Sequence, residues 1–182
     1  MKKVYLIRHA LPDFPGGKRM CIGTTDIPLG EAGLSQAAEM AKKLPAVTAV
    51  FSSPLSRALQ TAQRIGIPVV ILDDLRELHA GQWDGLTFDE IRQKYPDLYA
   101  ARASDLTLPL PDAEDNTAGL TRFTKAMHQA AETAAGDFAV VAHGGIIAQF
   151  LQSVGGKRYK PDYTQIITLC YENNVFTLQE DI

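Results

Sequence analysis

Two histidines and two arginines of this 182-residue chain stand at or just after the ends of short apolar runs. The pair Arg8–His9 follows the first run, Arg57 lies a few residues after a second, and His143 follows a third. Arginine binds phosphate oxygens through two parallel hydrogen bonds and stays charged. Neutral imidazole is a nucleophile towards phosphorus, and its ordinary pKa leaves much of it unprotonated near pH 7. Because phosphoryl transfer depends mainly on positioning and charge stabilisation, these residues predict phosphoryl chemistry without a metal.

Two local features favour a bound anion at this place. Arg57 is expected in the first turn of a helix, where a cation opposes the helix dipole by up to about 1 kcal/mol and a bound anion reverses that penalty. Gly144 and Gly145 leave backbone N–H groups at a helix start open to an anion. Each feature alone is commonly structural, since such arginines are often solvated and paired glycines often only make a turn. Their occurrence at matching positions favours the functional interpretation.

The surrounding sequence predicts alternating strands and helices that bring these residues to one edge of a sheet. Short apolar, β-branched runs are typical of buried strands, and the segments between them have helical spacing. Ser52–Pro54 is expected to open a helix, with serine as N-cap and proline in the first turn. The predicted strands are 4–7, 47–51, 69–72, 138–142, 166–171 and 175–179, and the predicted helices are 31–44, 54–65, 87–94, 120–134 and 146–154. This order implies an α/β sandwich with a mostly parallel sheet, in which ligands bind at the carboxyl ends of the strands.

The composition fits one globular domain over residues 1–182, with 46% hydrophobic residues. A net charge of −3 with both signs mixed along the chain gives no reason to expect nucleic acid or a membrane surface as a partner. No stretch approaches the ~18 apolar residues of a membrane span, and two cysteines do not suggest a disulfide framework, so a cytoplasmic location is expected. Because the chain has no His-x-x-x-His pair and no cysteine cluster, neither a metal nor a cofactor is expected.

Four segments resemble, in order, the successive signatures of the histidine phosphatase superfamily, in its phosphoglycerate mutase-like branch. They are LIRHA at 6–10, SSPLSRALQTA at 52–62, LRELHAGQWDG at 75–85 and VVAHGG at 140–145. The resemblance covers almost the whole chain. It implies a three-layer α/β/α sandwich with a mostly parallel central sheet, and a phosphohistidine intermediate.

The resemblance also implies roles for individual residues. His9 matches the nucleophile that takes the phosphoryl group, and Glu77 matches the proton donor to the leaving oxygen. Arg8, Arg57 and His143 match the pocket that binds the phosphoryl group. Apart from these roles, Arg19, Thr24, Thr25, His79 and Gly144 are candidates for further contacts with the substrate, and packing or hydrogen bonding to the neighbouring loop is an equal alternative for His79. Gly144 stands where the acid-phosphatase branch has an aspartate donor, which argues against that branch.

The chain departs from the family pattern at several positions. Ala10 replaces the usual glycine of Arg-His-Gly, and a methyl group fits there only if the backbone avoids positive φ. Leu11–Pro12 stands where Glu or Gln and Thr are common, so a polar phosphate contact is either lost or supplied by the long loop that follows. Pro111–Glu114 and Arg122 loosely resemble the family's Pro-Gly-Gly-Glu segment and a following arginine, and both a structural and a functional role remain open for them.

These features predict a phosphomonoesterase that acts on a small soluble phosphate ester. The short chain and the Gln82–Gly85 turn look most like the small alpha-ribazole phosphatase-type members, which act in cobalamin synthesis. The substrate itself depends on the variable region, roughly 86–117. One alternative is phosphoglycerate mutase-type transfer, although such mutases are usually longer and have a Trp-Asn loop that is missing here. A second alternative is a non-catalytic phosphoryl-binding module, for which the departures at Ala10 and Leu11–Pro12 are the only support.

Overall fold

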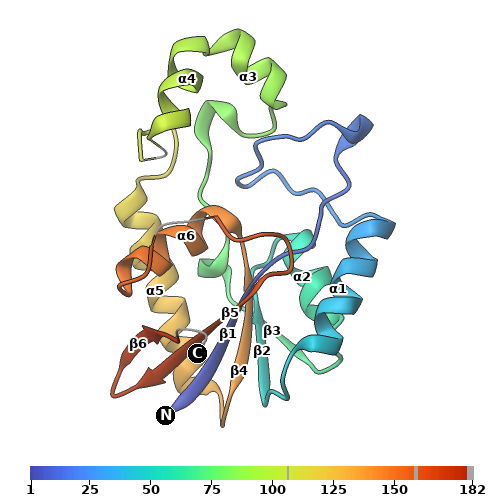
Figure 1. Ribbon diagram of the computed structural model, residues 1–182, viewed down its shortest axis with the longest axis vertical. Coiled ribbons are helices and arrows are strands. Elements are labelled where there is room, and N and C mark those ends of the chain that lie inside the picture. Colours follow the sequence, from blue (N-terminus) through green and yellow to red (C-terminus); the bar gives the residue numbers. More distant parts are fainter. Residues whose placement is uncertain (106, 158–159, 180–182) are drawn as a thin grey trace.

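A six-stranded sheet forms the centre of the computed structural model, which describes residues 1–105, 107–157 and 160–179 (Figure 1). The strands are β1 (Lys2–Arg8), β2 (Ala49–Ser52), β3 (Val69–Ile71), β4 (Phe138–Ala142), β5 (Ile166–Glu172) and β6 (Val175–Leu178). Their spatial order is β3-β2-β4-β1-β5-β6. The first four strands are mutually parallel, and β5 and β6 continue the sheet as an antiparallel hairpin. The predicted α/β fold with a mostly parallel sheet is thus confirmed, including the closing hairpin.

Six helices accompany the sheet in the part of the chain that the structure describes. They are α1 (Glu31–Lys43), α2 (Ser56–Gln63), α3 (Phe88–Lys94), α4 (Pro96–Ser104), α5 (Asn116–Thr133) and α6 (Gly144–Ser153), with short 3-10 turns at Pro15–Gly17, Asp73–Leu75 and Gly81–Trp83. In Figure 1, α1 and α2 lie on one side of the sheet and α5 and α6 on the other, which gives the three-layer arrangement. Helices α3 and α4 lie beyond the end of the sheet at which the parallel strands finish.

Alternation along the strands divides the core between the two faces. Leu6 and Val140 belong to the apolar cluster that includes α5 and α6, whereas Tyr5 and Ile7 pack with the side chains of α1 and α2. Such alternation is what a strand covered on both faces requires, because successive side chains point in opposite directions. The end of β1, which carries Arg8, therefore lies between the helices α1 and α2 on one face of the sheet and α5 and α6 on the other.

Three helices differ from the prediction: α2 and α5 in where they begin, and α4 in that it was not predicted. Helix α5 begins at Asn116 rather than at 120, because the Asp115 carboxylate caps it by accepting the N–H groups of Thr117 and Ala118. Helix α2 begins at Ser56, because Ser52 still belongs to β2 and Ser53 binds the Leu55 N–H through its hydroxyl rather than capping the helix. Helix α4 was not predicted, because Pro96 was interpreted only as the end of α3. The structure places Pro96 in the first turn of α4, where the missing N–H costs nothing.

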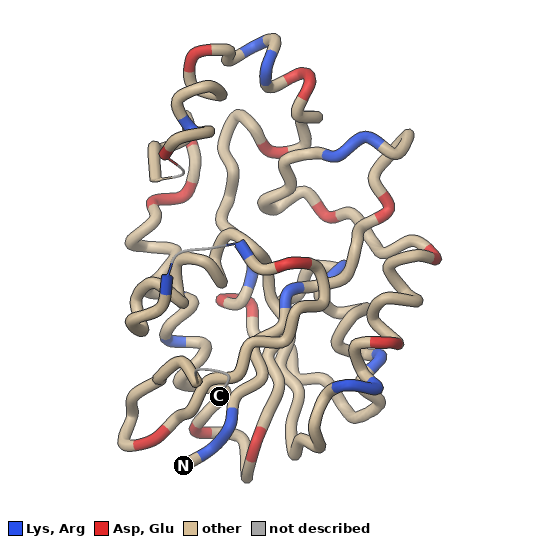
Figure 2. Tube along the Cα trace, in the orientation of Figure 1, with Lys and Arg blue, Asp and Glu red and all other residues tan. Residues whose placement is uncertain are grey.

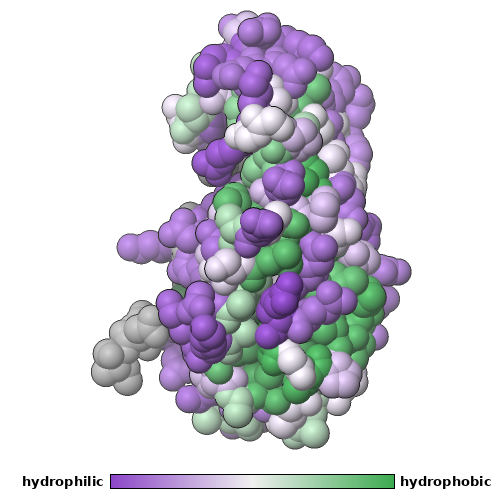
Figure 3. Space-filling view, turned by 90° about the vertical axis from the view of Figure 1, so that its right-hand side faces the viewer, coloured by the Kyte–Doolittle hydropathy of each residue, from purple (hydrophilic) through white to green (hydrophobic). Residues whose placement is uncertain are grey.

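The surface shows two further features. Figure 2 shows Lys and Arg positions interspersed with Asp and Glu along the whole trace. Val70 and Ile71 on the edge strand β3 are 44% and 49% exposed, and Figure 3 shows hydrophobic surface over the lower half of one side of the molecule. Within the described ranges no helix is long and apolar enough to cross a membrane.

Candidate active site

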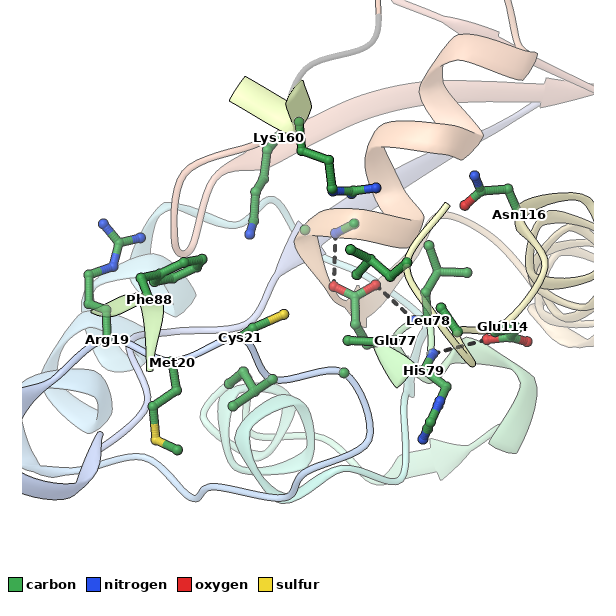
Figure 4. A pocket seen from close by; sticks show the side chains of 18 of the residues that line it. Arg19, Met20, Cys21, Glu77, Leu78, His79, Phe88, Glu114, Asn116 and Lys160 are labelled. Carbon is green, nitrogen blue, oxygen red and sulfur yellow. Dashed lines mark hydrogen bonds between the residues drawn. The ribbon is translucent and has the colours of Figure 1, made fainter. Parts of the chain in front are cut away.

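A cavity of about 400 Å³ opens at the carboxyl ends of the parallel strands (Figure 4). Its floor includes the end of β1 and the start of α6, and its walls come from the loop around 14–23, the segment 77–80 and the region 108–116. The predicted residues that line it are Arg8, His9, Arg19, Glu77, His79 and Gly144. This volume suits a small metabolite. Among the described residues, no three His, Cys, Asp or Glu side chains converge in a way that could hold a metal ion.

The backbone carbonyl of the next residue fixes the tautomer of His9. Its backbone N–H donates to the Ala142 carbonyl at 2.9 Å, which continues the β1–β4 pairing. Its Nδ1 lies 2.7 Å from the Ala10 carbonyl oxygen. Because a carbonyl only accepts, Nδ1 carries the proton and the lone pair is left on Nε2. Burial and then nearby Arg57 hold the pKa of His9 well below 6.5, so the ring is neutral at pH 7.

His143 stands opposite at the N-cap of α6, with its ring centroid 5.1 Å from that of His9. Its Nε2 lies 2.7 Å from Ser53 Oγ, and its buried Nδ1 has no hydrogen-bond partner among the described residues. Burial and then Arg57 also hold the pKa of His143 well below 6.5. Two neutral imidazoles therefore meet at the ends of β1 and β4.

Arg57 lies in the first turn of α2 and is completely buried. Its terminal nitrogens donate to the carbonyls of Thr25 and Gly23, each at 2.8 Å, and Asp26 lies 3.9 Å away. Its buried Nε has no partner within the described part of the chain. Burial lowers the pKa of Arg57, but a guanidinium stays charged in proteins. The expected penalty of a cation at a helix start is thus present, and the buried N–H without a partner is suited to an anion.

Arg8 is held from the other side by the segment before β5. Its Nη1 donates to the Pro161 carbonyl at 2.7 Å, and its guanidinium lies 3.8 Å from the centroid of the Tyr163 ring. Like Arg57, it keeps a buried Nε without a partner among the described residues. Two guanidinium groups are therefore immobilised through their outer nitrogens, while neither Nε–H donates to a described residue.

Glu77 caps the N-terminus of α6 across the cavity. Its carboxylate accepts from the backbone N–H groups of Gly145 and Ile146 at 2.8 Å and of Leu78 at 3.0 Å, the first and last of which can be followed in Figure 4. These contacts need bare backbone at the helix start, since a Cβ at Gly145 would lie 2.9 Å from the Glu77 carboxylate. The predicted proton donor is therefore in the cavity wall.

Glu114 and Arg122 are brought together behind this carboxylate. Arg122 forms a bidentate pair with Glu114 at 2.6 and 2.7 Å, and it donates to the backbone carbonyls of Asp74, Arg76 and Glu77 at 2.8 to 3.0 Å. These hydrogen bonds hold the segment from Asp74 to Glu77 against α5. The pair positions the segment that carries Glu77, which is a structural role, and Glu114 also lines the cavity.

Four predicted site residues do not line the cavity: Arg57 and His143, which are completely buried, and Thr24 and Thr25. The N–H groups of Thr24 and Thr25 and the Thr24 hydroxyl donate to the Asp84 carboxylate at 2.7 to 3.1 Å. Thr25 contributes its carbonyl to Arg57 instead. Ala10 is buried, its N–H donates to Thr61 Oγ1 at 3.0 Å, and it is not among the residues with positive φ. The methyl group in place of glycine is thus accommodated.

Lys160 and Tyr163 line the cavity although nothing in the sequence indicates it, and they lie on the segment leading to β5. The aliphatic chain of Lys160 passes over the first turn of α6: a Cβ at Gly144 would lie 2.7 Å from Lys160 Cε and 3.1 Å from Arg8 Nε. Loss of surrounding water and then Arg8 lower the pKa of Lys160. No motif marks these residues, and only the chain's return to the edge of β1 brings them here.

The fold and the site together define an α/β protein with a cation-rich cavity that suits a small anion. Residues 4–180 match the histidine phosphatase superfamily (branch 1), and the chain belongs to this family.

Several relatives cover most of this chain. It is 29% identical to the uncharacterized phosphatase PhoE of Bacillus subtilis, over 97% of this chain and 89% of the relative. It is 31% identical to the glucosyl-3-phosphoglycerate phosphatase of Mycolicibacterium vanbaalenii, over 86% and 75%. Among solved structures, the mycobacterial glucosyl-3-phosphoglycerate phosphatase Rv2419c in complex with VO3 superposes with a TM-score of 0.83 at 25% identity, covering 98% of both chains. YhfR of Bacillus stearothermophilus reaches a TM-score of 0.83 at 27% identity, over 98% of this chain and 95% of that one.

Proposed function

We propose that the protein is a metal-independent phosphomonoesterase that works through a phosphohistidine at His9. The observation that carries this proposal is the hydrogen bond between Nδ1 of His9 and the Ala10 carbonyl, 2.7 Å long, in a ring that burial keeps neutral. A neutral imidazole with its proton fixed on Nδ1 presents a lone pair on Nε2 without needing a base to activate it.

In the proposed first step, the phosphoryl group of the substrate enters between the two histidines. The Nε–H groups of Arg8 and Arg57 and the ring of His143 bind its oxygens, together with the first-turn N–H of Gly144. Charge on these oxygens is stabilised in the transition state by donors that are already in place.

The proposed chemistry then has two displacements. Nε2 of His9 forms a bond to phosphorus while the bond from phosphorus to the leaving oxygen breaks, and Glu77 gives that oxygen a proton. A water molecule next attacks the phosphohistidine, gives its proton to Glu77 and releases inorganic phosphate with free His9. The position of Glu77 in the cavity wall, bonded to the first turn of α6, supports its place in both steps.

Relatives support the reaction class. The Bacillus subtilis relative is called a phosphatase, and a 33% identical relative from Arabidopsis thaliana, matched over 80% of this chain and 65% of its own length, is called a metal-independent phosphoserine phosphatase. Alpha-ribazole phosphate stays a prediction from the sequence, since the alpha-ribazole phosphatases among the solved structures are 21% and 22% identical and show the fold alone. A cytoplasmic location likewise stays a prediction.

The test measures hydrolysis of an aryl phosphate by the wild-type protein and by His9→Ala, in the presence of a chelator. His128→Gln is the matched control, because His128 lies on α5 outside the cavity. We expect His9→Ala to lose activity by about 10³-fold or more, the control to keep it, and the chelator to have no effect. Wild-type activity in His9→Ala would overturn the proposal. Formation of 2-phosphoglycerate from 3-phosphoglycerate without release of phosphate would support the mutase alternative, and absence of any turnover would support the binding-module alternative.

A further inference from the structure

We propose that Tyr163 is a positioning residue for Arg8, whose guanidinium its aromatic ring holds in place for the phosphoryl group. The inference rests on the proposed function, because that function assigns Arg8 to the phosphoryl oxygens. It goes further by giving a role to a residue that lies outside the four motif segments, on the chain that leads to β5. Tyr163 acts through Arg8 rather than on the reacting atoms.

Arg8 is a buried cation that forms no ion pair with any residue in the described ranges. The residue is 7% exposed, and burial lowers the pKa of its guanidinium. Glu77 and Asp162 lie close enough to act on that pKa in the opposite direction, but neither is paired with Arg8. Its Nη1 donates to the Pro161 carbonyl at 2.7 Å. Because a buried charge needs compensation, one carbonyl and the group that faces the guanidinium must supply it.

The ring of Tyr163 is that group. Cζ of Arg8 lies over the ring, 3.8 Å from its centroid, well within the ~6 Å at which an aromatic face attracts a cation. A carboxylate at the same place would pair with the guanidinium and repel an incoming phosphate. An aromatic face therefore fixes Arg8 without cancelling the positive charge that phosphate binding requires.

The backbone next to Tyr163 is also built around Arg8. The Thr164 N–H donates to the Arg8 carbonyl at 3.0 Å, and the Arg8 N–H donates to the Gln165 carbonyl at 3.4 Å. Thr164 has a φ of 59°, which is strained for a β-branched residue and persists only where the surroundings hold it. Two consecutive residues thereby contact Arg8, Tyr163 at its guanidinium and Thr164 at its carbonyl. The backbone thus fixes the ring before a phosphate binds.

The neighbouring nucleophile offers a second route by which Tyr163 would act. The rings of Tyr163 and His9 have centroids 5.6 Å apart. A displaced His9 slows the attack on phosphorus and lowers kcat, whereas a loosened Arg8 weakens phosphate binding and raises KM. The Tyr163 hydroxyl forms no hydrogen bond to a described residue, so the ring face is expected to carry the effect. The split between KM and kcat and the loss of the hydroxyl alone therefore discriminate between these routes.

The experiment measures the dissociation constant of inorganic phosphate by calorimetry, together with kcat and KM for an aryl phosphate. Tyr163→Leu removes the aromatic face, and Tyr163→Phe keeps the face without the hydroxyl. We expect Tyr163→Leu to weaken phosphate binding by about 10- to 30-fold, the factor that a desolvated cation–π contact supplies, and to raise KM more than it lowers kcat. Tyr163→Phe is expected to stay within about twofold of the wild type.

A second cation–π pair supplies the matched control. Tyr99 on α4 lies outside the cavity, with Cζ of Arg92 5.3 Å from its ring centroid. Tyr99→Leu is expected to leave the dissociation constant of phosphate unchanged. Tm of each variant shows whether it is folded, and Tyr163→Met takes the place of Tyr163→Leu if the latter does not fold.

A double-mutant cycle shows whether Tyr163 acts through Arg8. In the Arg8→Met background, Tyr163→Leu is expected to change the dissociation constant of phosphate by less than about twofold, because the cation that the ring holds is gone. Equal weakening in both backgrounds would overturn the inference. So would phosphate binding in Tyr163→Phe as weak as in Tyr163→Leu, or a fall in kcat with unchanged phosphate affinity.

Failure of this inference is distinguishable from failure of the proposed function. Phosphate binding needs no turnover, so the cycle decides the inference even if His9→Ala keeps its hydrolytic activity and the proposed function fails. Conversely, loss of hydrolysis in His9→Ala together with wild-type phosphate affinity in Tyr163→Leu overturns the inference alone. Absence of phosphate binding to the wild-type protein would overturn both.

Discussion

Replacing Asp84 is expected to weaken phosphate binding, although this residue does not line the cavity. Its carboxylate accepts the N–H groups of Gly23, Thr24 and Thr25 and the Thr24 hydroxyl at 2.7 to 3.1 Å. Burial alone would raise the pKa of Asp84, but the hydrogen bonds outweigh it and the net pKa is lowered. The same short loop presents the carbonyls of Gly23 and Thr25 to Arg57. Asp84 therefore positions Arg57 through the loop.

The magnitude follows from which groups lose their partner in Asp84→Ala. Thr24 is exposed, so water replaces its two hydrogen bonds at little cost, whereas Gly23 is buried and its N–H is left unsatisfied. An unsatisfied buried donor costs about 1–3 kcal/mol, which lowers Tm by roughly 2–4 °C per kcal/mol in a protein of this size. A loop that no longer fixes the Arg57 guanidinium is expected to lower kcat/KM by about 10- to 100-fold, mainly through KM, since a lost charged hydrogen bond is worth about 1.5–3 kcal/mol.

The assay measures kcat and KM for an aryl phosphate, the inhibition constant of inorganic phosphate and Tm. Asp84→Asn keeps one acceptor oxygen and is expected to fall between the wild type and Asp84→Ala. Asp97→Asn, exposed on α4, is the control. The reasoning is refuted if both Asp84 variants lower Tm while KM and the inhibition constant of phosphate stay at their wild-type values, because Asp84 would then be only structural.

Three further changes test other contacts of the site. Gly144→Ala should fold but lose about tenfold in kcat/KM, because its methyl group would lie 2.7 Å from Lys160 Cε; unchanged kinetics would contradict this. Arg122→Gln removes hydrogen bonds that hold the backbone of the segment carrying Glu77, the proposed proton donor. It should therefore lower kcat more than KM and shift the pH profile of kcat. A change in Tm alone would argue for a purely structural role. Folding lowers the pKa of His9 and of His143, so the unfolded state binds more protons than the folded state below pH 6.5. The free energy of unfolding is therefore expected to decrease as the pH falls below 6.5, by about 1.4 kcal/mol per pH unit for each ring. Urea unfolding from pH 7.5 to 5.5 measures this loss, and a constant free energy of unfolding would show that the two rings bind protons in the fold as they do in the unfolded chain.

The sheet and the phosphoryl-binding residues could be predicted from the sequence because their signals are local. Short apolar runs mark the parallel strands, and a parallel sheet brings their carboxyl ends to one edge, so Arg8–His9 and His143 had to meet. Helix α4 was missed because a proline that ends one helix also begins the next. Its signal was Pro96 at a first-turn position, followed by helix-forming residues.

Other parts of the site depend on contacts between segments far apart in the chain. Lys160 reaches the cavity only because the chain returns beside β1, and Asp84 engages a loop about 60 positions earlier in the sequence. A sequence pattern carries no signal for such contacts, because neither residue type nor spacing sets them. The positions of Thr24 and Thr25 outside the cavity have the same origin, since their N–H groups donate to Asp84.

The most direct test of the central claim is to trap the covalent intermediate. The protein is mixed with a ³²P-labelled phosphomonoester, quenched at alkaline pH, where phosphohistidine is stable, and digested for peptide mapping. The account predicts one labelled peptide, which contains His9 and is absent from His9→Ala, while the peptide of His143 stays unlabelled. Label on His143, or full hydrolysis of the ester with no labelled histidine at any time point, would contradict it.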